Sequence, residues 1–231
     1  MNERPLYHLD LFSGIAGFAL AAQWANALAD TKSRGCCESG KCGSMAGVGA
    51  RRQDNTMPTS QSNPRIITIA HAEVEPFACA VYHRHFPQSV CFGGVQNITR
   101  DSILERTGVE QVDLVTGGFP CQPHSLAGKR LASADDRDLW GECARIVGDL
   151  RPRYALFENV AGLLTSESGR FFNRVLSDLA ALRYDVLWQV IPAAAVGAPH
   201  RRERVWIVAM ANGDERGGKQ DRVTKIGRAH V

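Results

Sequence analysis

The sequence predicts an α/β protein with a mainly parallel, doubly wound sheet and helices on both of its faces. Two observations lead to this expectation. Strand-like and helix-like patterns alternate along the chain, and small or polar residues follow the strands, where a parallel sheet presents its ligand-binding edge. The chain has 231 residues, 44% of them hydrophobic, which suffices for one sizeable core and is too few for two ordinary enzymatic domains.

The predicted elements follow from hydrophobic periodicity. Short apolar runs typical of strands occur at 6–12, 65–70, 112–118, 153–158, 185–191 and 204–209. Apolar residues at helical spacing occur at 18–29, 76–86, 139–150 and 170–182. The last two strands could pair as an antiparallel edge. Residues 30–64 are rich in Gly, Ser, Arg, Asn and Thr, and we interpret them as a surface insertion.

Composition excludes several classes of protein. Seven cysteines without dense, even spacing do not form a secreted disulfide scaffold, so we expect a cytoplasmic protein. No run approaches the ~20 uninterrupted apolar residues of a membrane span, and Asp10 interrupts any signal peptide. Residues 200–231 hold eight Lys and Arg against four Asp and Glu, which suits a phosphate-rich partner, although a solvated tail is the favoured interpretation.

Two groups at the predicted sheet edge suggest a nucleotide-like ligand. The turn at 12–17 is built of small residues, which let a ligand approach the backbone, although tight packing alone also requires glycine there. Glu73 follows the second strand, where a carboxylate can accept both hydroxyls of a ribose. Alternatively, Glu73 and Glu75 cap the helix that opens at Pro76.

A thiol and an acid follow the next two strands. Cys121 lies between Pro120 and Pro123 on a rigid loop, where a thiolate nucleophile would be presented, although most lone cysteines are buried fillers. Glu158 ends the neighbouring strand, and the apolar run before it predicts partial desolvation, which favours the protonated form of a general acid. Its alternative role is a helix cap or an ion-paired carboxylate.

Basic residues lead into the last strand. Strand alternation places Arg202 and Arg204 on one face, where two guanidinium groups can hold a carboxylate, a phosphate or a base carbonyl. A surface ion-pair lattice with Glu203 is the alternative. We expect no metal site at the cysteines of the insertion, because no nearby histidine completes one; these are Cys36, Cys37 and Cys42.

Four segments in this order, at 10–14, 120–122, 158–160 and 202–205, resemble the DNA cytosine-5 methyltransferases of bacteria and phages. The resemblance spans residues 6–209 without the insertion. It implies a Rossmann-like, S-adenosylmethionine-dependent methyltransferase fold with a catalytic domain at 1–29 and 65–211. Residues 30–64 would be a flexible insertion, and 212–231 a disordered or artefactual tail.

The resemblance also implies a cofactor site for S-adenosylmethionine. The residues carried over to it are Phe12, Ser13, Gly14, Ile15, Gly17, Glu73, Val74, Asn97 and Pro120. Four positions depart from the family, two of them being His124, where phenylalanine is usual, and His200, where glutamine commonly precedes the basic pair. Ala16 stands where glycine is usual, and Gly94 lies where an acidic residue generally accepts from the adenine amino group; Asn97 is the expected substitute.

The implied chemistry acts on a cytosine flipped out of double-stranded DNA. Cys121 would add to C6, Glu158 would protonate or hydrogen-bond N3, and Arg202 and Arg204 would contact the base carbonyl and hold Glu158. Asn159 would orient the loop. The residues expected to contact DNA are Gln122, Ser125, Lys129, Arg130 and Asn159.

The family continues with a target-recognition region and a closing motif that the sequence lacks. Residues 226–231 match one reading frame of a common sequencing adapter, so our hypothesis is that the gene is artificially truncated. A chain that is complete as written would need a partner polypeptide or be inactive. A second polypeptide could supply target recognition; if the gene is complete, we expect a monomer. The alternative function is a noncatalytic module that binds S-adenosylmethionine or a partner. A nicotinamide-dependent dehydrogenase is disfavoured, because the first turn lacks G-x-G-x-x-G spacing.

Overall fold

The computed structural model describes residues 4–33, 65–120 and 139–212, which form one seven-stranded sheet with the strand order β3-β2-β1-β4-β5-β7-β6. The strands are β1 Leu6–Leu11, β2 Ile66–Ala72, β3 Val90–Cys91, β4 Leu114–Gly117, β5 Tyr154–Val160, β6 Tyr184–Pro192 and β7 Glu203–Ala211. Strands β1 to β5 run parallel, and β7 is antiparallel to both β5 and β6. The predicted mainly parallel sheet is confirmed. The last two strands pair as expected, with β6 at the edge.

The strand order fixes where a ligand can bind. From β1 the chain continues to β2 on one side, whereas β4 pairs with β1 on the other side. The carboxyl ends of β1 and β4 therefore flank a topological switch point, where connections diverge and leave a crevice. The residues after β1, β2, β4 and β5 meet at this edge.

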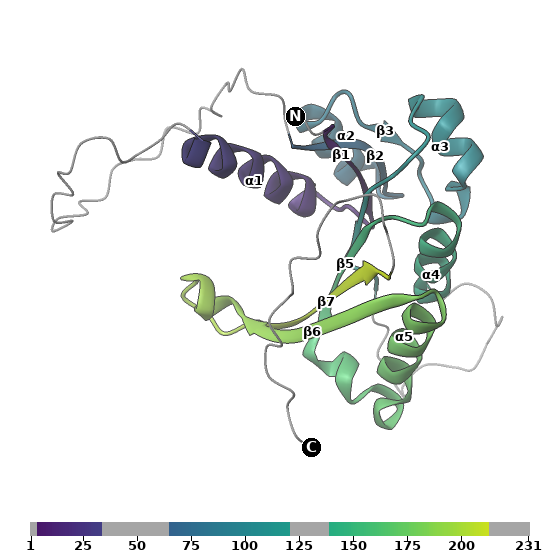
Figure 1. Cartoon of the computed structure of the whole chain (residues 1–231). Coiled ribbons are helices and arrows are strands. Elements are labelled where there is room, and N and C mark those ends of the chain that lie inside the picture. Colours follow the sequence, from purple (N-terminus) through teal and green to yellow (C-terminus); the bar gives the residue numbers. More distant parts are fainter. Residues whose placement is uncertain (1–3, 34–64, 121–138, 213–231) are drawn as a thin grey trace, which may run out of the picture.

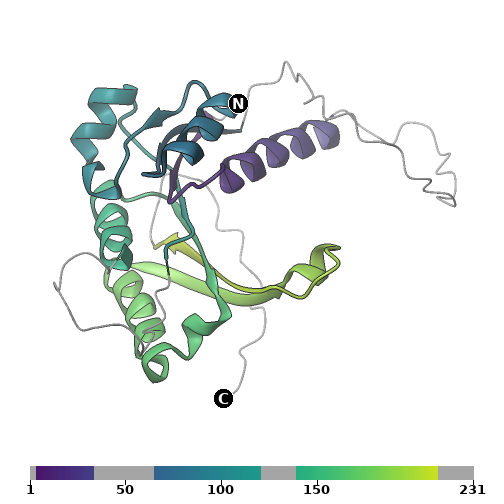
Figure 2. The same ribbon diagram turned by 180° about the vertical axis from the view of Figure 1, so that it is seen from behind.

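Helices cover the sheet unequally. The helices are α1 Gly17–Ser33, α2 Pro76–His85, α3 Arg100–Thr107, α4 Leu139–Leu150 and α5 Arg170–Ala181. Figures 1 and 2 show α3, α4 and α5 along one face and α1 on the opposite face. Helix α2 accompanies α1, because Tyr82 and Phe86 pack with Ala16 and Ala19 in a small separate cluster. Short 3₁₀ segments lie at Val95–Asn97, Ala161–Leu164, Ser166–Gly169 and Ala193–Val196.

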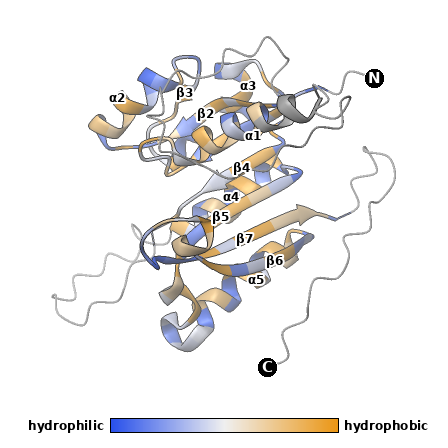
Figure 3. Ribbon diagram, turned by 90° about the vertical axis from the view of Figure 1, so that its left-hand side faces the viewer, coloured by the Kyte–Doolittle hydropathy of each residue, from blue (hydrophilic) through white to orange (hydrophobic). Residues whose placement is uncertain are grey.

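The main core lies between the sheet and the helices α4 and α5. Phe119, Trp140 and Phe157 form an aromatic cluster with ring centroids 5.3 to 6.2 Å apart. Figure 3 shows apolar residues concentrated on the central strands that α4 and α5 cover. Within the described segments, none of the helices combines the length and apolar character that a membrane crossing requires.

Three local features of the structure were not predicted from the sequence. Helix α1 runs to Ser33, four residues into the expected insertion, and residues 34–64 lie outside the described part of the chain. Strand β3 and helix α3 were not predicted, since β3 has two residues and α3 buries only Ile103. The face of α2 that packs inward carries Ala78 and Tyr82, whereas Phe77 is exposed.

Candidate functional site

The turn between β1 and α1 has an unusual backbone. Phe12, Gly14 and Ala16 have φ angles of 51°, 48° and 75°, in the left-handed region that favours glycine. Ala16 is fully buried in this conformation, which explains why glycine is usual at its position in the resembling family. The Ser13 amide donates to the Ala72 carbonyl at 3.1 Å, which ties the turn to the end of β2.

Glu73 connects the same two strand ends. One carboxylate oxygen, Oε2, accepts from the Gly14 amide at 2.8 Å, and Oε1 accepts from the amides of Val74 and Glu75, both at 2.9 Å. The helix-capping alternative holds only for Glu75, whose side chain accepts from Ala78 N at 2.6 Å. Because a carboxylate oxygen has two lone pairs, Oε2 of Glu73 retains acceptor capacity for a ligand hydroxyl.

The turn also has features that fit a bound cofactor. The Ser13 hydroxyl is buried and has no hydrogen-bond partner among the described residues, which is costly unless a ligand or water supplies one. A β-carbon added at Gly14 or Gly17 would meet no heavy atom within 4 Å. Ile15 and Val74 are largely exposed beside this space. Polar groups at the turn and apolar groups at its rim suit a ligand of mixed character.

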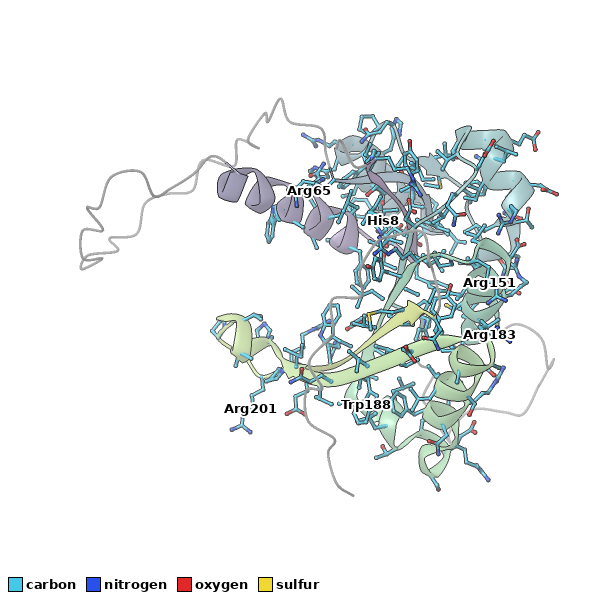
Figure 4. The ribbon with its side chains drawn as sticks, viewed as in Figure 1. His8, Arg65, Arg151, Arg183, Trp188 and Arg201 are labelled. Carbon is cyan, nitrogen blue, oxygen red and sulfur yellow. The ribbon has the colours of Figure 1, made fainter. Side chains whose placement is uncertain are left out.

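A series of buried, hydrogen-bonded polar side chains lies within the sheet next to the turn, and the sequence analysis did not predict it. His8 lies in the middle of the sheet (Figure 4), and its ring nitrogens bond the hydroxyls of Thr68 at 2.9 Å and Thr116 at 2.8 Å. Thr116 donates to Asp10 Oδ1 at 2.9 Å, and Tyr82 donates to Asp10 Oδ2 at 3.3 Å. Polar residues at alternate positions of an otherwise buried strand were the available signal.

Burial is the largest influence on the pKa values of these hydrogen-bonded side chains. Desolvation raises the pKa of Asp10 to about 7, although hydrogen bonds from Thr116 and Tyr82 oppose the shift. Desolvation lowers the pKa of His8 to about 3, so its ring is neutral at physiological pH. The same cause raises the pKa of Tyr82 far above its ordinary value.

The predicted acid is held by a predicted arginine. Glu158 lies on β5 opposite Trp206 of β7, and Arg204 Nε contacts Glu158 Oε1 at 2.7 Å. The two side chains retain only 26% and 21% exposure, so the pair is partly shielded from water. The ion-paired alternative for Glu158 is therefore observed, and its partner comes from the basic strand.

Arg202 differs from Arg204. It precedes β7, it is exposed, and its φ angle of 27° takes it out of the strand alternation. Its side chain makes no hydrogen bond or ion pair with any residue that the structure describes. Of the two arginines expected to hold Glu158, the structure brings only Arg204 into contact with it.

Glu158 also faces the segment that leads to the predicted thiol. A β-carbon on Gly118 would lie 3.2 Å from Glu158 Oε2, so the free carboxylate oxygen lies against this glycine. Asn159 is buried, donates to the Phe119 carbonyl at 2.9 Å and accepts from the Val160 amide at 2.8 Å. Asn159 therefore positions the backbone before the loop, and its burial argues against the DNA contact expected for it.

The described segment ends at Pro120, which is exposed. The remaining predicted residues of this loop, Cys121, Gln122, Ser125, Lys129 and Arg130, lie outside the described residues. Asn97, the expected adenine contact, donates its side-chain amide to the Phe92 carbonyl at 2.9 Å. This bond uses one hydrogen of Asn97 Nδ2 and fixes the orientation of the carboxamide.

A family model of C-5 cytosine-specific DNA methylases matches residues 46–228. The chain belongs to this family. Among curated relatives, Type II methyltransferase M.NgoMIV of Neisseria gonorrhoeae is 34% identical over 145 residues, which are 62% of this chain and 45% of the relative. Type II methyltransferase M1.ScrFI of Lactococcus lactis subsp. cremoris is 34% identical over 165 residues, covering 71% and 39%. This methylase chain thus spans less than half the length of these relatives.

Solved structures agree with the fold of this methylase family. A Dnmt2 methyltransferase of S. pombe superposes with a TM-score of 0.59 at 19% identity, covering 90% of this chain and 51% of that one. A mutant of Spodoptera frugiperda DNMT2 superposes with a TM-score of 0.60 at 21% identity, covering 91% and 51%. The predicted S-adenosylmethionine-dependent methyltransferase fold is confirmed.

Proposed function

We propose that the described domain, residues 4–33, 65–120 and 139–212, is the catalytic part of a DNA cytosine-5 methyltransferase of a restriction-modification system. The observation that carries this proposal is the Glu158–Arg204 pair at 2.7 Å, with the second Glu158 oxygen against Gly118. This places an acid beside the segment that leads to Cys121. The Glu73–Gly14 contact lies at the same edge of the sheet.

The cofactor site would hold S-adenosylmethionine, which when bound supplies an electrophilic methyl group. Glu73 Oε2 accepts from a ribose hydroxyl, and Ser13 supplies its unpartnered hydroxyl to the polar end of the ligand. The positive end of the α1 dipole favours its carboxylate. Ile15 and Val74 shield the apolar parts from water.

The substrate would be a cytosine flipped out of double-stranded DNA, because its C5 is unreachable within the stack. The Cys121 thiolate adds to C6, which makes C5 nucleophilic, while Glu158 hydrogen-bonds or protonates N3 as charge develops there. Arg204 fixes the position of the Glu158 carboxyl for this contact. C5 would then take the methyl group that the bound cofactor supplies, and the cofactor sulfur would keep the pair of the broken S–C bond. Transfer of the C5 proton to a base and departure of the Cys121 thiolate from C6 would complete the reaction.

Recognition of the DNA sequence would rest on a target-recognition segment, supplied by this chain or by a second polypeptide. The basic residues of the loop, Lys129 and Arg130, would contact DNA phosphates together with Ser125. Gln122 would contact the DNA beside the extruded base. Arg202 lies exposed at the entry to β7 and is available to the base or to a phosphate.

Covalent trapping tests the proposal. Duplex DNA that carries 5-fluorocytosine in place of cytosine is incubated with S-adenosylmethionine and the full chain, because fluorine at C5 prevents release of the thiol. We expect a denaturation-resistant adduct with the wild-type protein and with the control Cys91→Ser, and none with Cys121→Ser. An adduct that survives Cys121→Ser contradicts the assignment. Cofactor binding without any adduct supports the noncatalytic module instead.

A further inference from the structure

A side chain that the sequence analysis did not single out lies at the rim of the cofactor site. The loop after β3 runs through Gly94 into the 3₁₀ turn Val95–Asn97. A β-carbon on Gly94 would lie 2.5 Å from Gln96 Oε1 and 4.0 Å from Val74 Cγ1. The Gln96 carboxamide thus occupies the place that a side chain at position 94 would take, and it lies beside Val74.

Whereas Asn97 is held in one orientation, Gln96 is free to turn its whole carboxamide toward a ligand. Its side chain is exposed and has no hydrogen bond to any residue in the described segments, whereas the Asn97 amide is held by the Phe92 carbonyl at 2.9 Å. Val74 is 74% exposed and directly follows Glu73, the proposed ribose contact. A base attached to that ribose would lie on Val74 with its edge toward Gln96.

The chemistry of the carboxamide selects the base. A glutamine side chain presents one acceptor and two donors in a plane, which matches the amino group and an adjacent ring nitrogen of adenine. We propose that Gln96 reads the adenine edge of the cofactor and sets the preference for a purine that carries a 6-amino group. This inference rests on the proposed function, because it assumes that the site at Glu73 binds S-adenosylmethionine.

Two ligands that differ only in the 6-amino group test the contact between this group and Gln96. Binding is measured by calorimetry for S-adenosylhomocysteine and for its analogue in which hydrogen replaces the 6-amino group. Removing the amino group leaves Gln96 Oε1 without its donor, so we expect the wild-type protein to bind the analogue about five- to tenfold more weakly. In Gln96→Ala this ratio should fall to about twofold or less, because the acceptor is gone.

Two further variants sharpen the test. Gly94→Ala is expected to reproduce the loss of preference, because its β-carbon displaces the end of a flexible side chain while its φ of −71° suits alanine. Gln88→Ala, an exposed glutamine elsewhere, should keep the wild-type ratio. A wild-type ratio in Gln96→Ala overturns the inference alone. Wild-type protein that binds neither ligand overturns the proposed cofactor site and the inference with it.

Discussion

Asp10 makes the stability of this protein depend on pH in a direction opposite to that of most carboxylates. Its side chain is fully buried at the end of β1, and desolvation raises its pKa from 3.8 to about 7. Between these values the folded state holds a proton that the unfolded state has released. The stabilisation is fully present below pH 3.8 and is lost as the pH rises through 7.

The size of the effect follows from the two pKa values. They differ by about three pH units, and each unit corresponds to about 1.4 kcal/mol, so ionisation removes about 4 kcal/mol at most. About 2 to 3 kcal/mol of this loss falls between pH 5 and pH 8. Asp10→Asn removes the charge and keeps the shape, because hydroxyls such as those of Thr116 and Tyr82 can donate or accept.

Urea unfolding followed by circular dichroism measures this difference. The free energy of unfolding of Asp10→Asn, minus that of the wild type, should increase by about 2 to 3 kcal/mol between pH 5 and pH 8. The buried histidines His8 and His71, whose pKa values burial lowers to about 3 and about 4, weaken both proteins alike in acid, so they cancel in the difference. The exposed Asp185→Asn serves as the control. A difference that stays constant with pH would show that Asp10 is ionised throughout and refute the reasoning.

Three further predictions concern the site and the fold. Gly118→Ala should lower the rate of adduct formation roughly tenfold with unchanged circular dichroism, because its β-carbon displaces Glu158 Oε2; an unchanged rate would contradict the placement of the acid. Asp113→Asn should reduce the free energy of unfolding by about 1 kcal/mol in urea, since Asp113 accepts two bonds from the exposed Arg4 at 2.7 Å; full stability in 0.05 M salt would refute this. Thr99→Ala should lose about 1 kcal/mol with the capping box of α3, whereas Thr99→Ser should retain it.

Periodicity predicted the elements that bury a continuous apolar surface. Helix α4 has the predicted bounds, because its buried positions recur at helical spacing from Trp140 to Leu150. Helix α3 was missed since it is polar except at Ile103 and depends on its cap for definition. The exposed Phe77 shows a related limit: helical spacing reveals an apolar face but not whether another element covers it.

The site was predictable as far as strand order determines it. The contact of Glu73 with Gly14 follows because parallel strands end at one edge, and the neighbouring position of Glu158 and Gly118 follows for the same reason. The local backbone conformation could not be predicted from strand order. The φ of 27° at Arg202 removes it from the alternation, and the Gln96 rotamer depends on the empty place at Gly94.

The place of β7 between β5 and the edge strand β6 restricts how this chain can change in length. Because β7 is bonded to β5 on one side and β6 on the other, inserting or deleting one residue within it would turn Arg204 to the opposite surface of the sheet and strip Glu158 of its partner. The connection between β6 and β7 carries no such restriction. It projects to the side opposite α4 and α5 (Figure 1), so natural variation in length can collect there without disturbing the acid.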